Sequence, residues 1–132
     1  MVVDFGGTAT TFDVVDGAGR YVGGAIAPGI ELSLDALGER GAQLRTVELA
    51  RPTRVIARNT VEALQSGMVH GIASQVDGLV GRMLEELDAG PDVRVVATGP
   101  LAPLVGDECR CVTDHLPGLT LRGLEIAFRR NR

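Results

Sequence analysis

The residues best suited to chemistry lie near the start of the chain, in the run DFGGTATT at positions 4–11. Asp4 ends a strand-like apolar stretch, and Gly6 and Gly7 precede a series of hydroxyl residues that begins at Thr8. Glycines allow the backbone to turn with positive φ and to approach a ligand closely, and consecutive N–H groups in such a turn can bind an anion. We therefore expect a phosphate site at this turn with a cation held by Asp4. A tight β-hairpin without a ligand is an equally simple interpretation.

Arginine supplies every basic side chain of this protein. All 13 basic residues are arginine and none is lysine, against 17 acidic residues, so the net charge is −4. A phosphate group would therefore meet backbone N–H groups, hydroxyls, a metal ion or arginine. The negative balance argues against a nucleic-acid partner, because such binding needs a basic stripe that neutralises phosphates.

The composition is typical of a folded unit. With 132 residues, 45% apolar and 23% charged, the chain has room for one domain or for one lobe of a two-lobed protein. No run approaches the roughly 18 apolar residues of a membrane helix, and the first residues lack the charged start of a secretion signal, so we expect no membrane partner. Cys109 and Cys111 are expected to be free thiols in a reducing cytoplasm, because two thiols cannot complete a zinc site.

Hydrophobic periodicity and glycine or proline turns divide the chain into alternating elements. The expected order is three strands within residues 1–27, helices at 30–44 and 59–87, a buried strand at 93–99, a short apolar helix at 101–106, a strand at 109–113 and a final helix at 119–132. This order resembles the ribonuclease-H-like lobe of the actin, sugar-kinase and acetate-kinase superfamily. We predict an α/β fold in which residues 1–132 form a single lobe with three leading antiparallel strands.

Five stretches of the sequence resemble, in order, the second half of the type III pantothenate kinases, a family once also described as accessory transcription factors. They are VVDFGGTATTFDVVD, YVGGAIAPGIELSLDAL, RNTVEALQSGMVHGIASQVDGLVGR, VVATGPLAPL and LTLRGLEIAFRRN. The resemblance implies ATP-dependent phosphorylation of pantothenate, the first step of coenzyme A biosynthesis, on an acetate-kinase-like two-lobed fold. It also implies a dimer that uses a monovalent cation, K⁺ or NH₄⁺, together with Mg²⁺.

The resemblance assigns roles to particular residues. Asp4 matches the family's ligand for the monovalent cation, and Gly6, Gly7 and Thr8 match its ATP-contacting motif. Thr60 matches the threonine that contacts pantothenate. That position follows a predicted helix cap, where free N–H groups and the helix dipole favour a polar or anionic ligand. A capping-region hydroxyl with no ligand is the alternative interpretation of Thr60.

Two departures affect the nucleotide assignment. The family's usual run between the aspartate and the threonine is one glycine shorter than the run from Asp4 to Thr8. An added residue can shift the N–H groups of the turn by several ångströms, since consecutive Cα atoms lie ~3.8 Å apart. Pro100 also stands where the family usually has a second glycine, and proline removes one backbone N–H.

Two of the family's motifs do not occur in these residues. They are the Asp-x-Gly-Asn-Thr phosphate motif of the first half and the Gly-x-Asp-Arg segment that carries the catalytic base. No catalytic residue is therefore assigned, and Asp13 and Asp16 are interpreted as strand-end and turn residues. Three functions remain open: a kinase component completed by a first-half polypeptide, a non-catalytic binding or regulatory relative, and a truncated product with structural stability alone.

The missing motifs lead to two expectations about activity and assembly. Phosphoryl transfer needs a positioned hydroxyl and stabilisation of the charge that develops at the phosphate. The 132 residues alone are therefore not expected to phosphorylate pantothenate at a useful rate. The long apolar stripe of the helix at 59–87 also predicts that the chain pairs with a first-half polypeptide, with a second copy of itself, or with both.

Overall fold

Three antiparallel strands form one side of a five-stranded sheet in the computed structural model, which describes residues 1–41 and 47–132. They are β1 (Val2–Phe5), β2 (Ala9–Val15) and β3 (Tyr21–Pro28). The sheet order is β3-β2-β1-β4-β5. The three leading strands are therefore confirmed.

Two short strands extend the sheet on the other side of β1. β4 (Val96–Thr98) pairs in parallel with β1, and β5 (Asp114–His115) pairs in parallel with β4. β4 thus lies between two neighbours, and Ala97 and Thr98 are buried, which confirms the expected buried strand over a shorter range.

The strand predicted at 109–113 is wrong, because β5 begins at Asp114. The backbone N–H groups of Arg110 and Cys111 donate to the carboxylate of Asp77 on the long helix, at 3.1 and 2.9 Å. These donors are therefore committed to a helix, and the sheet ladder starts only after them. Alternation of apolar residues could not reveal this competing partner.

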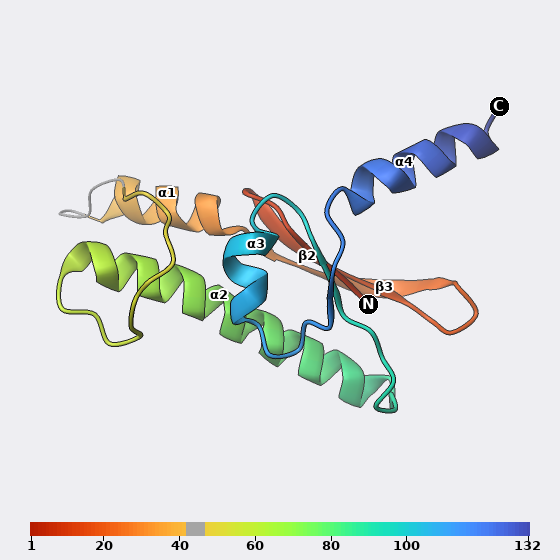
Figure 1. The fold of residues 1–132 in the computed structure, drawn as a ribbon, viewed down its shortest axis with the longest axis horizontal. Helices are drawn as coiled ribbons and strands as arrows, with labels where there is room; N and C mark the ends of the chain where they lie inside the picture. The colour runs from red at the N-terminus through yellow and green to blue at the C-terminus, as the bar shows by residue number, and fades with distance from the viewer. Residues whose placement is uncertain (42–46) are drawn as a thin grey trace.

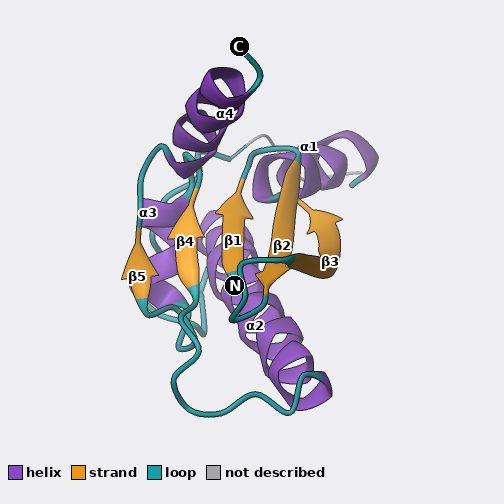
Figure 2. Cartoon of the chain, turned by 90° about the vertical axis from the view of Figure 1, so that its right-hand side faces the viewer, coloured by secondary structure: helices purple, strands orange, loops and turns teal. Residues whose placement is uncertain are grey.

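The side chains of β1 and β2 alternate between two faces of the sheet. Val3, Phe5 and Phe12 are at most 1% exposed and face the helices. All helices that pack on the sheet lie on this face, with α2 and α3 behind the strands in Figure 2. The core consists of apolar residues of the strands and of the helices behind them: Val3, Phe5, Phe12, Ala27, Ile30, Val69, Ala73, Val76, Val80, Val95, Ala97, Ala102, Val105 and Cys109.

Two helices connect β3 to β4. α1 spans Ile30–Arg40 with Gly41 as its C-cap, and residues 42–44 of the helix predicted at 30–44 lie outside the described residues. α2 spans Thr60–Glu86, and the side chain of Asn59 accepts a hydrogen bond from the N–H of Glu62 at 2.9 Å, as the capping pattern predicts.

The rest of the chain is built from short elements and a terminal helix. α3 (Ala102–Val105) continues into the 3₁₀ turn η1 (Gly106–Glu108), and α4 covers Leu119–Arg130. Figure 1 shows α4 extending away from the sheet and from the other helices. No helix in the described ranges has the length and hydropathy required to cross a membrane.

β3 forms one edge of the sheet, and its outer surface carries exposed apolar side chains. Tyr21 is 65% exposed and Ile26 is 80% exposed. The pairing with β2 is interrupted by an irregularity between Val14 and Val15, and Gly23 has a φ of 129°. The edge strand is therefore bent rather than flat.

Candidate functional site

The predicted phosphate and cation residues lie at one edge of the sheet. β1, β4 and β5 are parallel, so their carboxyl ends meet at the same edge, and Figure 2 shows α4 beyond that edge. Ligands of α/β proteins commonly bind outside the carboxyl ends of such strands. This edge is therefore the candidate site, and Asp4, the loop 6–8 and Gly99 all belong to it.

Asp4 lies on β1 with its side chain half-buried. The hydroxyl of Thr120, in the first turn of α4, donates to Oδ2 of Asp4 at 3.0 Å. A Cβ added to Gly99 would overlap Oδ1 of the same carboxylate and lie 2.8 Å from the backbone of Phe5. Asp4 is thus held between the end of β4 and the start of α4.

Gly99, at the end of β4, uses the left-handed region with a φ of 94°, and so does Gly118 before α4, with a φ of 71°. We expected positive φ in the Gly6-Gly7 turn, but neither of these glycines has it. Gly6 is required for close approach instead, because a Cβ there would lie 2.8 Å from the carbonyl oxygen of Ala9. A Cβ at Gly7 would overlap the carboxylate of Glu31, a flexible side chain that can move aside. The expectation about φ was wrong, because the turn is closed by contacts and not by a left-handed residue.

The first turn of α1 holds the loop 6–8 in place. The N–H of Gly29 donates to the carbonyl of Thr8 at 2.8 Å, and the N–H of Leu32 donates to the carbonyl of Gly7 at 3.2 Å. Gly29 itself has no room for a side chain, since a Cβ would lie 2.6 Å from the carbonyl carbon of Thr8. The loop therefore directs carbonyl groups to the helix, and the side chain of Thr8 is exposed.

Two carboxylates flank this loop. Asp4 precedes it on β1, and Glu31 on α1 lies against Gly7. A polyphosphate placed on the loop would be repelled by both, because like charges a few ångströms apart interact strongly near a protein surface. A phosphate ligand at this edge therefore requires a cation with it.

A hollow of about 270 Å³ lies on the same edge beside the end of β4. The side chain of Asp107 pairs with Nε2 of His115 at 3.3 Å at its wall. The hollow is lined by residues that follow or end the parallel strands: Ala97, Thr98, Gly99, Ala102, Pro103, Asp107, His115 and Pro117. The hollow lies next to Asp4, because Gly99 both lines the hollow and contacts the Asp4 carboxylate.

The structure does not bring Thr60 to this edge. Thr60 is the first residue of α2 and is exposed, in an open groove of about 500 Å³ that also includes Arg58 and Asn59. Figure 1 shows α2 beginning beside the far end of α1, whereas the loop 6–8 contacts the first turn of α1. An 11-residue helix is about 16 Å long. The predicted pantothenate contact and phosphate loop thus lie at opposite ends of α1.

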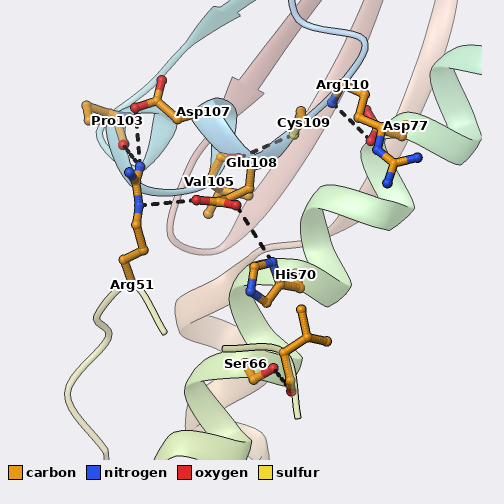
Figure 3. A network of polar contacts seen from close by, with 11 residues as sticks. Arg51, Ser66, His70, Asp77, Pro103, Val105, Asp107, Glu108, Cys109 and Arg110 are labelled. Carbon is orange, nitrogen blue, oxygen red and sulfur yellow. Dashed lines mark hydrogen bonds and ion pairs between the residues drawn. The ribbon is translucent and has the colours of Figure 1, made fainter. Parts of the chain in front are cut away.

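A second cluster of charges surrounds η1 (Figure 3). Arg51 reaches both acids of this turn, at 3.2 Å to Asp107 and 3.3 Å to Glu108, and Nδ1 of His70 lies 3.8 Å from Glu108. The charges pair with one another across segments that are distant in sequence. We interpret these ion pairs as structural contacts that hold η1 against the loop before α2 and against α2 itself.

The two cysteines lie beside Asp77, near this cluster. Burial opposes ionisation of Asp77, but the N–H groups of Cys111 and Arg110 hold the pKa of this carboxylate below its ordinary value. Burial, with added repulsion from Asp77, raises the pKa of Cys109 and of Cys111 to about 12. Both are free thiols, as predicted, and at neutral pH both stay protonated.

Three residues of the edge were missed by sequence reasoning. Thr120 lies 116 positions from Asp4, and no local pattern connects the two. Glu31 is in the first turn of α1, where an acid is expected simply to complement the helix dipole. Gly99 was placed only at the end of the strand predicted at 93–99, and its positive φ could not be read from the run ATGP.

Comparison with known proteins gives the family. Residues 1–82 match the family model described as type III pantothenate kinase. The chain is 70% identical over 132 residues to the type III pantothenate kinase of Nocardioides sp. (strain ATCC BAA-499 / JS614), covering 99% of this chain and 51% of that relative. It is 63% identical to that of Thermobifida fusca (strain YX), with the same coverage of both chains. The chain therefore belongs to the type III pantothenate kinase family.

Two further facts bear on the extent of the match. The chain spans about half the length of these relatives and corresponds to their C-terminal half. Its fold is similar to that of a Campylobacter jejuni protein described as a conserved Baf family transcriptional activator, with a TM-score of 0.60 and 22% identity. That match covers 98% of this chain and 57% of the other, so it supports the mixed α/β fold over nearly the whole chain.

Proposed function

We propose that this chain is the ATP- and cation-binding half of a type III pantothenate kinase and that a first-half polypeptide completes it. In this proposal its fold is the ribonuclease-H-like lobe of the actin, sugar-kinase and acetate-kinase superfamily. The observation that carries the proposal is the convergence of Asp4, the loop 6–8 and Gly99 on one sheet edge, in a chain 70% identical to a type III pantothenate kinase.

The edge has the donor types that a monovalent cation needs. Asp4 offers a half-buried carboxylate, and Thr120 offers a hydroxyl oxygen beside it. Oxygen donors of this kind suit hard cations. Asp4 and Thr120 would thus hold K⁺ or NH₄⁺, which would offset charge on the ATP phosphates, while Mg²⁺ would arrive bound to ATP.

The loop 6–8 is assigned to the phosphate groups of ATP. Its short side chains leave the backbone accessible, and the exposed hydroxyl of Thr8 can donate to a phosphate oxygen. The carbonyls of Gly7 and Thr8 are already occupied by α1, which fixes the loop before a ligand binds. Fixed donors lower the cost of positioning a phosphoryl group for transfer.

Thr60 is assigned to pantothenate through a neighbouring polypeptide. The groove at the start of α2 offers the Thr60 hydroxyl and the Arg58 guanidinium, which suit a substrate with hydroxyl and carboxylate groups. Because this groove and the loop 6–8 lie at opposite ends of α1, one copy of the chain cannot place both around one small substrate. A first-half polypeptide, a second copy, or both must complete the site. The free thiols support a reducing compartment such as the cytoplasm.

The test follows ADP release with ATP, Mg²⁺, K⁺ and pantothenate. The chain is assayed alone and after co-production with a first-half polypeptide taken from the unmatched part of the Nocardioides relative. We expect turnover in the mixture and at least ~10²-fold less from the chain alone, because positioning and general-base groups are missing from it. Robust turnover by the chain alone would contradict the need for a partner. A mixture that binds ATP but releases no ADP would favour the non-catalytic alternative.

The role of Asp4 has its own test in the active mixture. Asp4→Asn keeps the shape and removes the charge, so the K⁺ concentration for half-maximal activity should rise roughly tenfold, about 1.4 kcal/mol of cation binding. The matched control is Asp35→Asn, which removes a carboxylate from an exposed position on α1. Unchanged K⁺ dependence in Asp4→Asn, or an equal change in Asp35→Asn, would count against the assignment.

A further inference from the structure

α4 carries a stripe of large apolar side chains that the described part of the chain leaves uncovered. Leu121, Leu124 and Phe128 follow one another at spacings of three and four, which places them on one helix face. They are 72%, 61% and 61% exposed, and α4 has no buried residue. We call these three residues the α4 stripe. Adjacent exposed apolar side chains of this size mark an interaction surface.

The rest of α4 contains most of its charged residues, together with the exposed apolar side chain of Ile126. The segment from Leu119 to Arg132 has four arginines and one glutamate, in a chain whose net charge is −4. Arg122 and Arg129 lie on the face away from the stripe, and the guanidinium of Arg132 lies 4.6 Å from the centre of the Phe128 ring. Because these arginines lie away from the stripe, a complementary partner is defined by an apolar groove that receives the stripe.

The comparison with relatives indicates the occupant. The match to the Nocardioides kinase covers 99% of this chain, so it includes α4, and about half of that relative lies outside this chain. α4 extends beyond the carboxyl edge of the sheet (Figure 2). The hydroxyl of Thr120, at the base of α4, donates a hydrogen bond to Asp4. A polypeptide that covers the stripe therefore lies beyond the same edge of the sheet as Asp4. The first half of a two-lobed kinase must face that same edge for its own phosphate motif to reach ATP.

We propose that the α4 stripe is the docking surface for the first-half polypeptide and that α4 holds that half over the candidate site. The inference rests on the proposed function, since it takes the other half of the kinase as the occupant. It adds the location of the contact on this chain, its apolar chemistry, and its position next to the proposed cation ligand.

The test compares two substitutions on opposite faces of α4. Leu124→Asp places a charge in the stripe, whereas Ile126→Asp makes the same kind of change on the other face, where Ile126 is 45% exposed. Each variant carries a tag and is co-produced with the first-half polypeptide, and the amount of retained polypeptide is measured over a dilution series. We expect Leu124→Asp to weaken retention by roughly 30-fold or more, and Ile126→Asp by less than about threefold.

Hydrogen exchange gives a second measurement that needs no variant. The amides of α4 should exchange rapidly in the chain alone and become protected in the complex, because docking removes the helix from solvent. Circular dichroism of both variants without the partner should match that of the unmodified chain, which shows that loss of retention is not loss of folding.

Each outcome decides the proposal. Selective loss of retention in Leu124→Asp with protection of α4 supports it. Equal retention of the first-half polypeptide by the unmodified chain and by both variants overturns the proposal. Retention by none of these three proteins also overturns it. Light scattering could instead show that the unmodified chain is a homodimer and that Leu124→Asp is a monomer. This result also overturns the proposal, because the α4 stripe is then covered by a second copy of the chain. A complex that forms through the stripe but releases no ADP leaves the docking surface intact and contradicts the proposed kinase function instead.

Discussion

The helices α2 and α4 both carry regular apolar stripes, but their surroundings differ. In α2, Val69, Val76 and Val80 are fully buried against the sheet, whereas in α4 the stripe at Leu121 and Leu124 is mostly exposed. The spacing of apolar residues therefore predicts which face of a helix is buried in a contact. It does not predict whether the contact is made by the same chain or by another polypeptide. α2 is covered by its own chain, and α4 presents the same kind of face outward.

The largest expected difference is in stability. Val76→Asp places a charge in the core and should reduce the free energy of unfolding by at least about 4 kcal/mol, because the carboxylate has no partner there. Leu124→Asp should change it by less than about 0.5 kcal/mol, since an exposed position loses little packing. Urea denaturation of both variants measures the contrast. A similar loss of stability in the two would show that α4 packs on this chain.

A second prediction concerns Gly99, which follows β4 and lies beside Asp4. Gly99→Ala should destabilise the chain by about 1–3 kcal/mol, because the position has a φ of 94° and the methyl group would overlap Asp4. The matched control is Gly71→Ala in α2, where an added Cβ meets open space and helix propensity improves by up to about 1 kcal/mol. Thermal or urea denaturation should give opposite signs. Equal signs would mean that Gly99 is not conformationally required.

The smallest expected effect is at the bond that joins α4 to the sheet. Thr120→Val removes the donor to Asp4 while keeping the shape, so cation binding in the active mixture should weaken about two- to fivefold, as expected for one hydrogen bond of about 1 kcal/mol. Thr120→Ser should restore it. A merely structural role would leave the K⁺ dependence unchanged and alter stability in both variants.

Local patterns predicted the elements that depend on neighbours in sequence. The glycine turns and the alternating residues predicted the three leading strands, and Asn59 predicted the start of α2. The strand predicted at 109–113 failed because Asp77, more than thirty positions away, holds those backbone donors. A contact of that kind leaves no periodic signal.

The candidate site shows the same division. Asp4 and the loop 6–8 were found because their residue types are adjacent in the chain. Thr120 and Gly99 were not found, because the parallel pairing of β1 with β4 and the direction of α4 bring them to Asp4. Thr60 was assigned from a motif, and its position at the other end of α1 could come only from the fold.

The bent edge at β3 bears on how the chain behaves at high concentration. An exposed strand with apolar side chains such as Ile26 can act as a template for stacking of further chains into fibres. Here Pro28 lacks a backbone N–H, and Gly23 and the irregularity at Val14 twist the strand away from a flat register. The edge therefore resists the growth of ordered aggregates, although it presents apolar surface to solvent.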